Sequence, residues 1–439
     1  MKIVLLGAGK SAGFLIEYTA KWTSKADVQF IIADQQVMHL EGLKNEFPSV
    51  RTVSADLSKP DKREELIREA FLVISMLPAF MHPEIAEQCL QSGAHLVTAS
   101  YESEQIKSMS DAVKQNDLIF INECGLDPGL DHMSAMRIIH HAHEQGKEIE
   151  AFYSYCGGLV SPDCVGDNPW AYKFSWNPRN VILAGQGTAR YLEDGKLRFI
   201  PYHRLFGNSR AINIDGKLYD GYPNRDSLSY REVYGLQHVK TMLRGTLRNS
   251  DFCKAWDVFV QLGLTDDSYQ FPLQESISYR DFIGAFLPAG QGTFEDSLLA
   301  CCKNDGRILE MIEWTGIASN KLVGIKEGSP AKILQTLLEE KWKLNAEDRD
   351  LVVMQHIFKV NFSGKTQTIK SSLYLEGEPE GKTAMAKTVG LPLAIAGRLI
   401  AEKKFQSPGI HIPVRPELYN PILDEVEHDY GICFREEMA

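Results

Sequence analysis

The chain has 439 residues, of which 44% are hydrophobic, 24% charged and 10% aromatic, an ordinary globular composition that excludes a disordered chain. Acidic residues outnumber basic ones by 58 to 47, and the net charge of −11 argues against an electrostatic binder of nucleic acid or anionic membranes. This length predicts two or three domains.

Neither a membrane span nor a secretory signal is predicted. The richest apolar run, residues 71–81, is interrupted by Ser75 and Pro78 and falls short of the ~18 residues that a span needs. The 8 cysteines are scattered and form no C-x-x-C pair, which indicates reduced thiols. We therefore expect a cytoplasmic protein whose partner is a small molecule, not nucleic acid or a membrane.

The first part of the chain alternates short β-branched strands with helices. The predicted strands are residues 2–6, 28–32, 49–53, 71–76, 95–98 and 118–122. The predicted helices between them are residues 11–22, 38–47, 62–70, 83–92 and 104–115. Short, continuously apolar strands are typical of burial on both faces, and intervening helices make the connections parallel. The pattern predicts an α/β fold with a Rossmann-type doubly wound parallel sheet.

The alternation of short strands and helices ends at about residue 130. A long helix and a strand are followed by a Gly/Pro-rich loop, then hairpin-like turns, a charged helix, two strands and a last helix. These elements are residues 131–145, 149–155, 157–169, 193–196, 214–217, 331–343, 350–360, 366–374 and 392–403. We predict that residues 1–130 and 390–439 form the dinucleotide-binding domain, and that residues 131–389 form an inserted α+β domain with a mixed sheet.

A glycine-rich loop follows the first predicted strand. Its residues Gly7, Gly9, Lys10, Ser11 and Ala12 fit the G-x-G-x-x-G/A pattern, in which the first glycine allows a tight turn and the second lets backbone N–H groups approach a pyrophosphate. An unrelated glycine turn is the alternative interpretation.

Asp34 ends the second predicted strand, where a carboxylate accepts hydrogen bonds from ribose hydroxyls and repels a 2′-phosphate. No arginine stands beside Asp34. The sequence therefore predicts NAD as the cofactor, with NADP disfavoured.

Three loops lie at the carboxyl ends of predicted strands, where open α/β sheets bind ligands: residues 75–78, 98–101 and 123–129. Each alone is equally well an ordinary capped turn, but three at one edge beside the glycine-rich loop favour a site. We expect Leu77 and Pro78, with Asp56 after the third strand, at the cofactor. No metal site is predicted, because the histidines at 140, 141 and 143 have no third ligand nearby in sequence.

Six sequence runs resemble the saccharopine dehydrogenases of the glutamate-forming type. They are GLDPGLDHM (125–133), SYCGGL (154–159), DNPWAYKFSW (167–176), GYPNRDS (221–227), LRGTLR (243–248) and DLVVMQH (350–356). The resemblance implies NAD(P)-dependent oxidation of the secondary amine of L-saccharopine. Hydrolysis of the imine then gives L-glutamate and 2-aminoadipate 6-semialdehyde, in lysine metabolism. It also implies a homodimer with an interface on the second domain.

The resemblance further implies site residues. Saccharopine carries three carboxylates, which arginine binds bidentately with its planar fork. The implied substrate-binding residues are Ser100, Tyr101, Lys173, Arg225, Arg244, Thr246, Leu247 and Arg248. For each cation the alternative is a surface salt bridge. The candidates for proton transfer are Asp127, Tyr101 and Cys156; Asp127 ranks first, and its alternative is a turn or helix cap.

Two other functions stay open. A carboxynorspermidine dehydrogenase-like enzyme of polyamine metabolism acts on a substrate with one carboxylate and an extra amine, so it should have acids where this chain has arginines. A non-catalytic NAD-binding regulatory protein would keep the glycine-rich loop and Asp34, but it would not need Tyr101, Asp127, Arg225 and Arg248 together.

Overall fold

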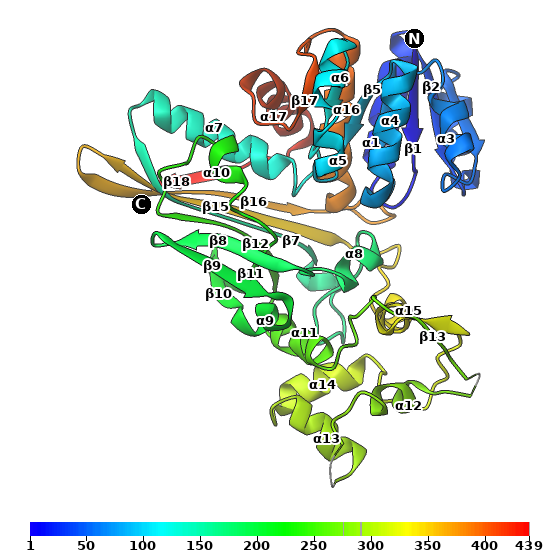
Figure 1. Ribbon diagram of the computed structural model, residues 1–439, viewed down its shortest axis with the longest axis vertical. Coiled ribbons are helices and arrows are strands. Elements are labelled where there is room, and N and C mark those ends of the chain that lie inside the picture. The colour runs from blue at the N-terminus through cyan, green and yellow to red at the C-terminus, as the bar shows by residue number, and fades with distance from the viewer. Residues whose placement is uncertain (275, 290–291, 439) are drawn as a thin grey trace. The chain divides into compact units, whose positions relative to one another are not determined.

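The computed structural model describes residues 1–274, 276–289 and 292–438, which form two compact units (Figure 1). Unit 1 comprises Met1–Lys147 and Gly381–Arg435, and unit 2 comprises Glu148–Glu380 with the chain's last residues from Glu436. The first boundary lies after Lys147 and not at residue 130. The reason is that Arg137, on the helix that follows residue 129, forms ion pairs with Asp424 at 2.6 Å and Glu427 at 3.1 Å within unit 1.

A parallel seven-stranded sheet forms the centre of unit 1, in the order β17-β6-β5-β4-β1-β2-β3. The strands are β1 (Lys2–Leu6), β2 (Gln29–Asp34), β3 (Val50–Ser54), β4 (Leu72–Ser75), β5 (His95–Thr98), β6 (Ile119–Ile121) and β17 (Gly409–His411). This order is that of a Rossmann sheet with one extra edge strand from the C-terminal segment. The predicted doubly wound sheet is confirmed, and every strand predicted before residue 125 is present.

Helices cover both faces of this sheet. They are α1 (Gly13–Lys25), α2 (Leu43–Glu46), α3 (Pro60–Ile67), α4 (His82–Ser92), α5 (Glu104–Lys107), α6 (Ser110–Gln115), α7 (Leu130–Glu144), α16 (Ala384–Ala401) and α17 (Pro416–Tyr430), with short 3-10 turns η1 (Met38–Leu40) and η2 (Ala79–Met81). The helices α3 to α6 pack on one face through an apolar cluster that includes Val4, Ile85 and Phe120. In Figure 1 the C-terminal α16, β17 and α17 lie among the blue and cyan elements of the first 147 residues.

The helix α16 begins earlier than predicted and contains Pro392 in its interior. The sequence pattern predicts a helix only over residues 392–403. In the structure a Cβ at Gly390 would lie 2.9 Å from the backbone N of Leu15, and one at Gly397 would lie 3.0 Å from Leu72. Packing this close on α1 and β4 stabilises the longer helix. By length and composition α16 is apolar enough to cross a membrane, but 78% of it is buried inside the protein.

A buried histidine links the carboxyl ends of β4 and β5. His82 Nε2 lies 3.0 Å from Ser75 Oγ and 3.3 Å from Thr98 Oγ1. Burial lowers the pKa of His82 from 6.5 to about 4, so the ring is neutral in the folded protein at neutral pH.

Because buried His82 is neutral, we expect the free energy of unfolding to decrease in acid. Between pH 6.5 and about 4 the unfolded chain binds a proton at His82 that the folded protein does not, so stability present above pH 6.5 falls as the pH falls. The loss is about 3 kcal/mol. Denaturant titrations at pH 7 and pH 4.5 should therefore show a smaller decrease in the free energy of unfolding for His82→Gln than for the wild type. Equal decreases would assign the acid sensitivity to other groups.

Unit 2 is built around a mixed sheet whose main path is β10-β11-β12-β7-β15-β16-β18, with β8 pairing β12 and β9. Its strands are β7 (Glu148–Val160), β8 (Thr188–Glu193), β9 (Lys196–Pro201), β10 (Arg210–Ile214), β11 (Lys217–Pro223), β12 (Thr241–Asn249), β15 (Asp350–Phe362), β16 (Lys365–Glu376) and β18 (Arg435–Met438). A small sheet pairs β13 (Phe271–Pro272) with β14 (Glu327–Gly328). The three predicted hairpins are confirmed as β8/β9, β10/β11 and β15/β16.

The helices of unit 2 are α8 (Pro178–Ile182), α9 (Tyr202–Leu205), α10 (Tyr230–Val233), α11 (Phe252–Gln261), α12 (Tyr279–Gly284), α13 (Phe294–Cys301), α14 (Gly306–Trp314) and α15 (Pro330–Lys341), with 3-10 turns η3 (Pro162–Cys164) and η4 (Phe206–Asn208). They enclose an aromatic core around Trp170, Trp256 and Trp342. A separate apolar cluster contains Tyr155, Leu243 and Leu247. Because strand residues alternate between faces, Arg244, Thr246 and Arg248 lie on the face of β12 opposite to Leu247.

Candidate active site

The glycine-rich loop joins β1 to α1 as the sequence predicts. Gly7 has φ +94°, a backbone conformation that disfavours other residues, and Leu77 lies against it from the loop after β4. A Cβ at Gly9 would meet no atom within 4 Å, so the loop is open there, while Lys10 is exposed and Ala12 is buried. Backbone N–H groups at the start of α1 are therefore available to a phosphate group.

Asp34 makes contacts within the protein that the sequence does not predict. Its Oδ2 accepts a hydrogen bond from the backbone N–H of Ala8 at 2.7 Å, and its Oδ1 accepts one from the N–H of Gln36 at 3.0 Å. The two carboxylate oxygens thus stabilise the loops that follow β1 and β2. Asp56 is also bound locally, accepting hydrogen bonds from Ser58 and from Gln35 Nε2 at 3.1 Å.

Tyr101 and Asp127 lie together at the carboxyl edge of the sheet in unit 1. The Tyr101 hydroxyl donates to Asp127 Oδ1 at 3.4 Å, and both side chains are half-buried. Asp127 sits in a turn closed by hydrogen bonds from Gly125 N–H to the Pro128 carbonyl and from Leu130 N–H to the Gly125 carbonyl. The N-cap of α7 is Gly129, with no side chain capping it.

A second group of charged residues beside this pair was missed by the sequence analysis. Glu123, Asp131 and His132 are all buried, and His132 Nε2 lies 2.9 Å from Glu123 Oε2. The available signal was the position of Glu123 directly after a buried strand, where an acidic side chain needs a partner.

In unit 2 three of the substrate candidates, Arg244, Thr246 and Arg248, share one face of the sheet. Thr246 is paired in register with Cys156 on β7 and with Tyr222 on β11, so these side chains share a face with Arg244 and Arg248. Both arginines are buried. Arg244 lies over the Tyr230 ring at 4.4 Å. Cys156 is a buried cysteine of unit 2 that forms no disulfide, whereas Asp127 and Tyr101 belong to unit 1.

Arg248 is a buried cation without a carboxylate partner among the described residues. It is 3% exposed, lies 5.4 Å from the ring centroids of Tyr172 and Phe252, and donates from Nη1 to the Leu247 carbonyl at 3.0 Å. Its Nε has no hydrogen-bond partner within the described part of the chain. A buried guanidinium is costly without an anion, so this site fits a ligand carboxylate.

Other predicted substrate residues have different surroundings. Lys173 Nζ lies 2.8 Å from both carboxylate oxygens of Asp348, so this cation already has its anion. The Leu247 side chain is buried in the apolar cluster on the opposite face of β12, which leaves only its backbone for a ligand. Arg225 is exposed, and its neighbour Asp226 forms an ion pair with Arg190.

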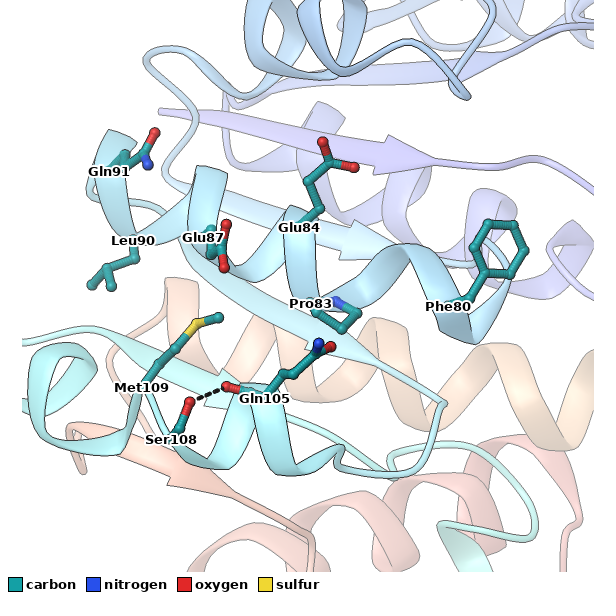
Figure 2. Close-up of a pocket in the computed structure, with 9 residues that line it drawn as sticks. All are labelled: Phe80, Pro83, Glu84, Glu87, Leu90, Gln91, Gln105, Ser108 and Met109. Carbon is teal, nitrogen blue, oxygen red and sulfur yellow. Dashed lines mark hydrogen bonds between the residues drawn. The ribbon is translucent and has the colours of Figure 1, made fainter. Parts of the chain in front are cut away.

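A surface pocket of about 510 Å³ lies between η2, α4 and the segment of α5 in unit 1 (Figure 2). Its lining combines apolar Phe80, Leu90 and Met109 with Glu84 and Glu87. None of the predicted site residues lines it. Among the described residues, no group of three or more His, Cys, Asp or Glu side chains is arranged to hold a metal ion.

The Rossmann sheet with its open glycine-rich loop, joined to a second unit carrying buried arginines, defines the class of a dinucleotide-binding oxidoreductase. Residues 3–121 match the family model "Saccharopine dehydrogenase NADP binding domain", and residues 125–432 match "Saccharopine dehydrogenase C-terminal domain". The chain belongs to the saccharopine dehydrogenase family.

Individual relatives agree with this assignment. Saccharopine dehydrogenase [NADP(+), L-glutamate-forming] of Saccharomyces cerevisiae is 31% identical, over 99% of this chain and 98% of its own. The apo structure of a saccharopine dehydrogenase (L-Glu forming) from the same yeast covers 100% of this chain and 99% of its own, with 30% identity and a TM-score of 0.86. Mitochondrial alpha-aminoadipic semialdehyde synthase of Rattus norvegicus is 33% identical over 99% of this chain. The chain spans about half of that protein, 47% of its length.

The prediction of NAD as cofactor is wrong. The matching N-terminal family model is an NADP binding domain, and the fungal relatives are named for NADP(+). In the structure both oxygens of Asp34 accept backbone N–H groups, so this carboxylate already has a structural role apart from any ribose. The acid at the end of β2 serves the loop structure, and its presence does not select NAD.

Proposed function

We propose that this protein oxidises L-saccharopine at the carbon that becomes the aldehyde of 2-aminoadipate 6-semialdehyde, releasing L-glutamate. The observation that carries the proposal is Arg248, a buried arginine without a carboxylate partner among the described residues, which suits a substrate rich in carboxylates. Arg244, on the same face of β12, adds a second buried cation. These arginines disfavour carboxynorspermidine, and a regulatory protein would not need them.

The side chains of unit 1 supply the proton transfers. Saccharopine nitrogen is protonated at neutral pH, and Asp127 takes this proton so that the neighbouring carbon can lose a hydride. Tyr101, 3.4 Å from Asp127, orients the carboxylate and shares the proton. Water then adds to the resulting iminium carbon and passes one proton to the nitrogen. The hydroxyl proton is lost to solvent as the C–N bond breaks to give the aldehyde, and the proton held by Asp127 returns to the amine of the released glutamate.

The dinucleotide of the proposal is NADP, which is supported by the NADP binding domain model and by the fungal relatives named for NADP(+). When bound, it supplies the hydride acceptor. The open surface at Gly9 and the start of α1 would hold the pyrophosphate, with Leu77 and Pro78 after the neighbouring strand β4. Lys10, the exposed cation of this loop, would be the residue to pair with the 2′-phosphate. The homodimer and the cytoplasmic location remain predictions. Sedimentation would test the first, and cell fractionation would test the second.

Asp34→Ala should weaken NADP and NAD by similar factors, because it removes the hydrogen bond that shapes the loop at Ala8 and not a ribose contact. Lys10→Ala should lower affinity for NADP more than for NAD. Fluorescence titration of each variant with both reduced dinucleotides measures the two ratios. A selective loss of NAD binding in Asp34→Ala would restore the ribose-binding role of this carboxylate.

The activity itself is tested with purified protein, saccharopine and NADP. NADPH formation at 340 nm should be accompanied by glutamate and the semialdehyde, identified by mass spectrometry. Lysine and 2-oxoglutarate as products would mean that the other carbon is oxidised. Turnover of carboxynorspermidine in preference to saccharopine would overturn the proposal.

A further inference from the structure

The buried pair Glu123 and His132 has no part in the chemistry described above. Glu123 is 4% exposed and His132 is 0% exposed, and His132 Nε2 donates to Glu123 Oε2 at 2.9 Å. Burying a carboxylate and an imidazole away from water is costly even when they are paired. The pair lies beside the loops that carry Tyr101 and Asp127.

Glu123 holds both neighbours of Tyr101. Its backbone N–H donates to the Ser100 carbonyl at 3.0 Å, and its Oε1 accepts from the Glu102 N–H at 3.0 Å. Glu123 itself has φ +56°, a conformation uncommon outside glycine. The loop that carries Tyr101 is therefore fixed on both sides by one residue.

His132 connects Glu123 to the turn that carries Asp127. It lies in the first turn of α7, and its Nδ1 is 3.6 Å from Asp131 Oδ2. The other oxygen of Asp131 accepts the N–H of Gly129, at the end of the Asp127 turn, at 2.6 Å. A continuous series of contacts thus runs from the Tyr101 loop through Glu123 and His132 to the Asp127 turn.

The pair at the other end of this series is sensitive to small movements. The Tyr101–Asp127 distance of 3.4 Å is longer than the 2.5–3.0 Å of a well-formed O–H···O bond. A change of less than 1 Å therefore decides whether the hydroxyl shares the proton of the carboxylate.

We propose that Glu123 and His132 are positioning residues that set the separation of Tyr101 and Asp127. The effect expected on kcat rests on the proposed function, whereas the effect expected on the loops that carry Tyr101 and Asp127 does not. The titratable groups facing Glu123 are His132, Asp131 and Glu102, and burial together with the charge of Glu123 raises the pKa of Glu102.

The kinetic test compares Glu123→Gln with Glu104→Gln, which removes an exposed carboxylate three residues after Tyr101. We expect Glu123→Gln to lower kcat by about 10- to 100-fold while the KM for saccharopine and the affinity for NADPH stay within about threefold. The control should match the wild type. Combining Glu123→Gln with Tyr101→Phe should cost little beyond the larger single effect, because both changes act on the same pair.

Amide hydrogen exchange gives a readout that needs no substrate. Glu123→Ala and His132→Ala should each speed exchange in residues 99–103 and 125–131, with α1 and β2 unchanged. Faster exchange everywhere would indicate general destabilisation and overturn the inference, as would kcat within twofold of the wild type in Glu123→Gln. Wild-type protein that fails to oxidise saccharopine would overturn the proposed function instead, and the exchange experiment would still decide the positioning role.

Discussion

Asp127→Asn is expected to lower kcat for saccharopine oxidation by about 10² to 10⁴, the usual cost of losing a general base. The expectation rests on the turn after β6, which holds the half-buried carboxylate 3.4 Å from the Tyr101 hydroxyl at the carboxyl edge of the Rossmann sheet. Hydride can leave the substrate only after its nitrogen loses a proton. Asparagine keeps the size and one acceptor oxygen, so saccharopine binding should survive.

The pH dependence separates this role from others. The acidic limb of the kcat profile should disappear in Asp127→Asn and persist in Asp111→Asn, which alters an exposed carboxylate of α6. A kcat near that of the wild type would remove Asp127 from proton transfer. The function as base would then pass to Tyr101 or to Cys156, which Tyr101→Phe and Cys156→Ser would distinguish.

Arg248→Met should raise the KM for saccharopine by about 30-fold or more, since losing one partner of a buried charge pair costs about 2–5 kcal/mol. Affinity for NADPH should not change. The same substitution should stabilise the ligand-free protein, because methionine replaces a guanidinium that has no carboxylate partner among the described residues. A higher unfolding midpoint with a higher KM is the expected combination.

Lys173→Met is the matched control for Arg248→Met. Lys173 is paired with Asp348 in the same unit, so its loss leaves a buried carboxylate without its cation and should lower the unfolding midpoint. Its effect on KM should be small unless the variant unfolds. If Arg248→Met instead destabilised the protein and left KM unchanged, Arg248 would be a structural residue.

The sequence alone predicts the architecture because the responsible signals are local. Continuous apolar strands separated by helical spacing specify the parallel sheet, and Asp-Gly or Ser-Gly turns specify the three hairpins of unit 2. The start of α16 was misplaced because Pro392 is tolerated inside a helix that packs closely on α1. The edge loops with Tyr101 and Asp127 were also identified from strand ends.

Only the tertiary structure decided what each polar side chain binds. Lys173 and Asp348 are 175 residues apart in sequence, so no local pattern reveals that this cation is already paired, whereas Arg248 is not paired with a carboxylate among the described residues. Asp34 has the position of a ribose ligand, but its oxygens accept backbone N–H groups brought there by folding. Charge and position along the chain are properties of the sequence, whereas the partner of a buried charge depends on which distant segments fold against it.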